Sequence, residues 1–252
     1  MNKKLVIIIG SILALLLIVG GFIVAMNIGK IDPNTKTTTN RTTTATDNFK
    51  SVTSVAIDYT SINDYLTKVG FTDSKVKSSK NAISASTNSL ASYFSNVTAI
   101  AAFTRGSTDL NSVNPYEVAS VGLYEFASGK KNVDSSALSS KAADNQIAGL
   151  NKSFEPIGGL KNAKNTPAGT ITAKTSDGKI AHGNCNYVTA TAITPKKTSS
   201  LGVYVCMIKV GVSAVYIGTV RIQYADEVPV QTAVDLKLLA QNIATNSTIV
   251  AK

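Results

Sequence analysis

The chain has no tryptophan and a single histidine, His182. Sugar-binding sites often stack the sugar on an aromatic face, and the largest aromatic side chain is absent here. A structural zinc site needs four cysteine or histidine ligands, and His182 with two cysteines falls short of that number. His182 stands beside "GNCN" in a β-rich stretch and is interpreted as a strand or turn residue. We therefore predict no metal site and no bound cofactor.

Arginine is also scarce, because Arg105 and Arg221 are the only arginines from Asp47 onward. Proteins that bind nucleic acid favour arginine for bidentate contacts with phosphates and base edges. In the same stretch, 20 basic residues against 14 acidic ones give a net charge of +6, with the lysines spread singly or in pairs. This pattern predicts an ordinary solvated surface, and weak attraction to an anionic lipid or cell-envelope polymer is the alternative. No nucleic-acid partner is predicted.

Familiar catalytic motifs are missing from the sequence. There is no G-x-S-x-G elbow, no H-E-x-x-H helix, no phosphate-binding glycine loop and no cysteine nucleophile with an obvious base. None of the spacings among the 15 acidic residues selects a catalytic pair. The adjacent Asp226 and Glu227 precede Val228 and Pro229, so they are interpreted as a turn into the last helix. No catalytic residue is predicted.

One long apolar run is present, and it covers Leu5–Met26 without a single charge. As a helix, these 22 residues would span about 33 Å, enough to cross a bilayer. The rival interpretation is a cleavable signal peptide, but its apolar core is usually shorter and is followed by an A-x-A-like site, which is lacking here. We expect residues 5–26 to be a transmembrane signal anchor, with residues 1–4 as a cytoplasmic tail.

Residues 27–48 follow the anchor and contain eight threonines between Thr35 and Asp47. This segment has almost no apolar surface to bury, so burial cannot offset the entropy lost on ordering. We predict a disordered stalk that carries an extracytoplasmic domain, residues 49–252. Whether the stalk is glycosylated depends on the host.

The first half of this domain, about 60–153, has the spacing and caps of helices. Helices are predicted in four ranges, 60–70, 78–106, 114–129 and 132–150. The third begins with Asn114 as a cap, although "VASVGLYEF" within it could also be a strand. The fourth is capped by Asp134. Two prolines and three glycines in residues 155–169 then mark the most favourable internal boundary.

The second half, about 168–245, changes to the two-residue period of strands. The turn "SDGK" and the segments "VYVCMIKV" and "AVYIGTVRIQY" predict a four-stranded antiparallel meander. A final helix follows, with Ala233, Leu236, Leu239, Ala240 and Ile243 on one face. The expected fold class is α+β, with a helical first half packed on the meander and the C-terminal helix.

The only two cysteines, Cys185 and Cys206, lie on neighbouring strands of this meander. If the connecting turn is centred on Pro195 and Lys196, the cysteines stand directly opposite each other. In an exported chain they would then form a disulfide, and two buried free thiols are the alternative. Tyrosines at 187, 204, 216 and 224 on the same strands either cover the core or form an interaction face.

These features predict a single-pass membrane protein whose extracytoplasmic domain is a binding or structural module at the cell surface. Its partner classes are the membrane, an anionic envelope polymer or another surface protein. One alternative is an envelope hydrolase with carboxylates brought together by folding. The other is a pilin-like assembly subunit, because pilins also place an apolar helix before a disulfide-bearing β region. Against it, the chain lacks the pilin processing glycine and acidic residue, and Asp32-Pro33 interrupts a continuous helix.

Overall fold

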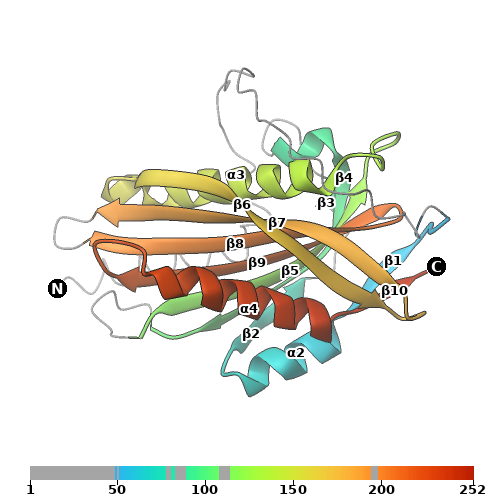
Figure 1. Ribbon diagram of the computed structural model, residues 1–252, viewed down its shortest axis with the longest axis horizontal. Helices are drawn as coiled ribbons and strands as arrows, with labels where there is room; N and C mark the ends of the chain where they lie inside the picture. The colour runs from blue at the N-terminus through green and yellow to red at the C-terminus, as the bar shows by residue number, and fades with distance from the viewer. Residues whose placement is uncertain (1–48, 50, 78–80, 83–88, 108–113, 194–197) are drawn as a thin grey trace.

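The structure of the chain is a computed structural model (Figure 1), and it describes residues 49, 51–77, 81–82, 89–107, 114–193 and 198–252. The predicted anchor at residues 5–26 and stalk at residues 27–48 lie outside the described residues. Among the helices of the described part, none is long and apolar enough to cross a membrane.

The described chain forms one curled, mainly antiparallel sheet of ten strands. The strand order is β1-β10-β6-β7-β8-β9-β5-β4-β2, and β3 pairs with β4. Their bounds are β1 Val55–Asp58, β2 Thr72–Lys77, β3 Asn81–Ala82, β4 Phe94–Arg105, β5 Tyr116–Phe126, β6 Leu160–Thr175, β7 Ile180–Ile193, β8 Thr198–Val210, β9 Ser213–Tyr224 and β10 Thr248–Ala251.

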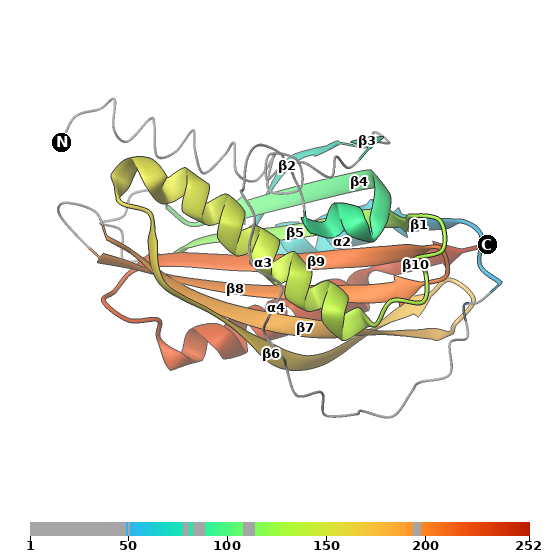
Figure 2. The same ribbon diagram turned by 90° about the horizontal axis from the view of Figure 1, so that it is seen from above.

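Three described helices cover the sheet on opposite faces (Figures 1 and 2). Helix α3 (Ser135–Phe154) packs on β6, β7 and β8 from one side. Helix α4 (Val230–Asn246) packs on β6, β8 and β9 from the other side, with α2 (Tyr59–Lys68) beside it. Each face therefore has its own hydrophobic core, one shared with α3 and one with α4 and α2. Two short 3-10 turns, Ser89–Ser92 and Glu155–Ile157, complete the described elements.

The predicted α+β fold with a helical first half is wrong. The residues before α3 contribute strands β1 to β5, which are five of the ten strands of the sheet. The expected helix at 78–106 is replaced by the short strand β3, the 3-10 turn and the long strand β4. The expected helix at 114–129 is replaced by β5, so the alternative interpretation as a strand was the right one. Both faces of β5 are covered, and nine of its 11 residues are buried. This burial removes the alternation of polar and apolar residues that identifies a strand.

Two helices of the first half are confirmed. Helix α2 begins one residue before the predicted start, and its cap is Asp58, whose carboxylate accepts a hydrogen bond from the Thr60 amide at 2.9 Å. Helix α3 is capped by Asp134 as expected. Its end does not lead into a separate region, because β6 joins the same sheet directly after residues 155–159.

The four-stranded meander and the final helix are also confirmed, as β6 to β9 and α4. The turn between β6 and β7 is the predicted one, with Gly178 at a φ of 82°. Ile193 pairs with Thr198 across the next connection, so the register is centred on Pro195 and Lys196 as predicted. The positions of residues 194–197 themselves lie outside the described part.

Candidate functional site

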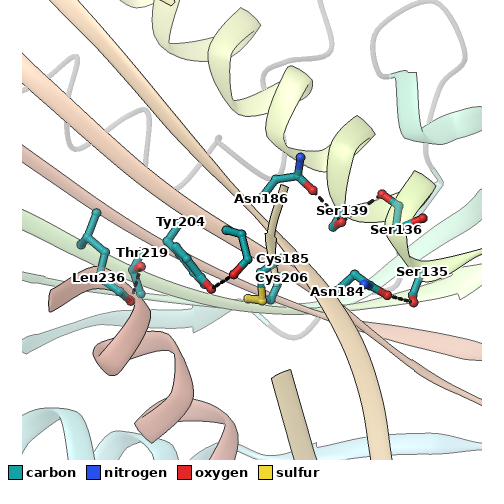
Figure 3. The surroundings of a disulfide bond; sticks show 11 residues. Ser135, Ser136, Ser139, Asn184, Cys185, Asn186, Tyr204, Cys206, Thr219 and Leu236 are labelled. Atoms are coloured by element: carbon teal, nitrogen blue, oxygen red, sulfur yellow. Dashed lines mark hydrogen bonds between the residues drawn. A yellow bond between two sulfur atoms is a disulfide. The ribbon is translucent and has the colours of Figure 1, made fainter. Parts of the chain in front are cut away.

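A disulfide joins Cys185 in β7 to Cys206 in β8 (Figure 3), so the predicted bridge is confirmed. The two residues are direct partners in the strand pairing. Their Cα atoms are 4.1 Å apart, near the roughly 4.5 Å spacing of a non-hydrogen-bonded antiparallel pair. Both cysteines are buried in the hydrophobic cluster shared with α4. The bridge therefore clamps the centre of the sheet and is closed to solvent.

A polar seam lies on the opposite face of β7, formed by the residues that flank Cys185 (Figure 3). Ser139 of α3 donates a hydrogen bond to Asn186 at 2.8 Å, and Ser135 donates to Asn184. The Asn186 amide in turn donates to Asn165 of β6 at 2.8 Å. These contacts fix the position of α3 on β6 and β7. The sequence carries no signal for this seam, because the hydrogen-bonded pairs are 21 to 49 positions apart.

A cluster of charged side chains lies on the other face, where α4 packs on β9, and it extends across β9 to the neighbouring strands β5 and β4. Glu117 accepts from the Arg221 Nε at 2.8 Å and also pairs with Arg105. Arg221 donates to Asp235 of α4 at 2.6 Å. The side chain of Glu117 is 4% exposed and that of Arg221 is 14% exposed, so their charges are compensated within the protein. This cluster ties α4 to the sheet.

The pKa of the Asp235 carboxyl is lowered, first by a hydrogen bond from Gln231 and also by its contacts with Arg221. Asp235 therefore stays ionised, as expected for an acid that accepts hydrogen bonds from a guanidinium. Arg105 also stacks on Phe71, with its guanidinium carbon 4.5 Å from the ring centre. Each of these charged groups has a structural contact, so the cluster offers no free acid or base.

Among the described residues, three buried hydroxyl groups on the same face have no hydrogen-bond partner: those of Tyr187, Ser200 and Thr232. Two of them lie around Gly202, where an added Cβ would stand 2.7 Å from Thr232 Cγ2 and 3.1 Å from the Tyr187 oxygen. Buried hydroxyls usually have partners. The charge cluster and these hydroxyls together form the candidate site. Its chemistry suits hydrogen bonding to a small neutral polar group rather than acid-base catalysis.

The other residues considered from sequence do not converge on this site. His182 is an exposed residue of β7, and Asp226 and Glu227 lie in the turn before α4, as expected. Tyr187 and Tyr204 face the α4 core, whereas Tyr216 belongs to the α3 core and Tyr224 is half exposed. The four tyrosines therefore do not form one interaction face.

Within the described ranges, no group of three or more His, Cys, Asp or Glu side chains is arranged to hold a metal ion. No family model, curated protein or solved structure matches this chain.

Proposed function

We propose that the chain is a single-pass, membrane-anchored protein whose extracytoplasmic domain serves as a binding or structural module at the cell surface. The observation that carries this proposal is the buried Cys185–Cys206 disulfide. Disulfides persist in oxidising compartments and are rare in the cytosol. The uncharged run Leu5–Met26 and the threonine-rich segment after it supply an anchor and a stalk.

The place where the chain enters the domain indicates which end of the domain would face the membrane. Phe49 is buried in the α4-side core, and Val52 contacts Gly211 in the turn between β8 and β9. The stalk would therefore attach at this end of the long strands, beside the C-terminus (Figure 1). The opposite end, where β7 and β9 finish and α4 begins, would point away from the membrane.

This distal end carries exposed apolar side chains that suit contact with another protein. Ile193 and Tyr224 are each 50% exposed, and Val230 is 90% exposed. Exposed apolar side chains grouped at one place mark contact surfaces more often than isolated ones do. A second surface protein is therefore the partner class favoured here. The carboxylates of Glu117 and Asp235 are bound to Arg221, so they do not support the alternative of an envelope hydrolase.

The test is protease added to intact cells or protoplasts that express the full chain. We expect the domain to be digested while a cytosolic marker survives. In the same sample, mass spectrometry without reduction should find Cys185 and Cys206 joined. A matched control replaces Leu15 and Ile18 by lysine, which should prevent the chain from anchoring in the membrane, whereas L15I/I18L should not.

A domain that resists protease in cells where an outer marker is digested would refute the orientation. Free thiols at both positions in that compartment would contradict the extracytoplasmic placement. If the lysine variant remained in the membrane as firmly as L15I/I18L, residues 5–26 would not be the anchor.

A further inference from the structure

The outer side of α4, which faces the viewer in Figure 1, carries a line of exposed apolar side chains. Val230, Val234 and Leu238 are 90%, 54% and 58% exposed, whereas the other side of α4 packs on the sheet. Because they stand four residues apart, they form one continuous ridge along the helix, called here the α4 ridge. Val230 begins it at the distal end, so the exposed apolar surface of that end continues along α4.

The two edges of the α4 ridge differ in charge. At about 100° of turn per residue, Lys237 lies along one edge, and Gln231 and Asp235 lie along the other. Lys237 is exposed, and the side chain of Asp235 is 35% exposed although it also binds Arg221. When two helices pack side by side in the same direction, opposite edges meet. The α4 ridge is therefore complementary in charge to a second copy of itself.

We propose that the α4 ridge is the contact between two copies of this chain anchored in the same membrane. This inference names the partner of the surface module and so rests on the function proposed above. In both copies α4 begins at the distal end, so the two helices run in the same direction. A two-fold axis along the membrane normal places Val234 against Val234 of the second copy, and Lys237 of each copy beside Asp235 of the other. Each copy presents one ridge, so the assembly closes as a pair.

The contact is small compared with that of a stable dimer. Ridges of residues four apart pack at an angle of about −50°, so two such helices touch over a short stretch only. Three side chains bury far less than the roughly 800 Å² per partner of a standard interface. Pairing therefore depends on the membrane, which raises the local concentration of the copies and holds them in one orientation. In dilute solution the chain should be monomeric.

Cysteine crosslinking of the full chain in its membrane tests the pairing. Cys185 and Cys206 are joined and buried, so an introduced thiol is the only reactive one. Val234→Cys places this thiol at the centre of the α4 ridge, and oxidation with copper phenanthroline and dissolved oxygen joins thiols that lie close together. The matched control is Lys130→Cys, at an exposed position in the turn before α3. Non-reducing gels measure the covalent dimer, and an intact native bridge verifies folding.

We expect V234C to form at least tenfold more covalent dimer than K130C in membranes, and to lose this dimer when diluted in detergent. V230C should also crosslink with itself. Mixed with an epitope-tagged L238C chain, it should give no product between positions 230 and 238, which lie eight residues or about 12 Å apart along parallel helices.

Equal crosslinking of V234C and K130C, no dimer of V234C, or a product between positions 230 and 238 would overturn the proposal. If V234C fails the folding check, V230C takes its place. Protease treatment of the same cells separates this result from the proposed function. A digested domain without the crosslink rejects the pairing alone, whereas a protected domain refutes the placement outside the cell and the pairing with it.

Discussion

Glu117 is the residue on which the charge cluster depends, because it is nearly buried between Arg105 and Arg221. Glu117→Ala would leave Arg221 buried with only Asp235 as partner. Removal of one member of a buried ion pair typically costs about 3–5 kcal/mol, and we expect the lower end because Arg105 is one-third exposed. Urea unfolding measures this loss.

The matched control is Glu227→Ala, which removes an exposed acid near α4 and should change stability by less than about 0.5 kcal/mol. If the two variants were equally stable, the cluster would not hold α4 to the sheet.

Asp177 gives a prediction about pH at the turn between β6 and β7. Hydrogen bonds from Lys179 and then from Thr175 lower the pKa of its carboxyl to about 2. A lowered pKa means that the folded state favours the ionised form. Its stabilising effect should be complete above the unfolded pKa of about 3.9 and fade as the pH falls toward 2.

Carbon-13 NMR titration of the carboxyl measures this value directly. In Lys179→Ala, the pKa should rise toward that of a free aspartate. A wild-type value near 4 would show that the contacts with Lys179 and Thr175 do not persist in solution.

At the scale of helices and strands, the sequence predicted those elements correctly that carry a local signal, such as a helix cap or a turn. Helix α3 has its cap at Asp134, and the position of the turn at 195–196 was enough to place Cys185 opposite Cys206. Prediction failed for β4 and β5: β5 is buried on both faces, and in β4 the consecutive residues Ala101, Ala102 and Phe103 are buried, so neither strand keeps the two-residue period there. The charge cluster could not be found for the same reason. Glu117 meets Arg221 across 104 positions, through a strand that had been assigned as a helix.

The pairing of β7 with β8 should depend on the disulfide. Its cysteines are 21 positions apart, and a bridge closing a loop of this size restricts the unfolded chain by roughly 3 kcal/mol. The double variant C185S/C206S should therefore lose about 2–4 kcal/mol in denaturant unfolding. Because Leu5–Met26 is distant in sequence, membrane attachment should be unchanged.

The single variant Cys206→Ser is the accompanying control, since it also lacks the bridge and should be destabilised to a similar extent. Stability equal to that of the oxidised wild-type chain would show that the bridge contributes nothing to the fold.

At the scale of the whole molecule, the open edge of the sheet bears on whether the protein stays monomeric or associates edge to edge with a second copy. Strand β10 pairs with β6 at Lys174 and Thr175, so among the described residues the stretch from Leu160 to Ala173 has no partner on that side. This edge carries exposed Lys161 and Lys164, contains Pro167 and is interrupted by two shifts in register. Charges, proline and bulges are the features that prevent sheets from joining edge to edge.

The triple variant K161T/K164T/P167T should therefore self-associate. We expect size-exclusion chromatography to show a shift from monomer to oligomers or aggregates, because the unpaired amides of β6 could then pair with those of a second copy. The control K130T/K131T removes the same charge from exposed positions in the turn before α3 and should elute like wild type. If both variants associated equally, net charge would be responsible. If neither associated, the shifts in register alone would protect the edge.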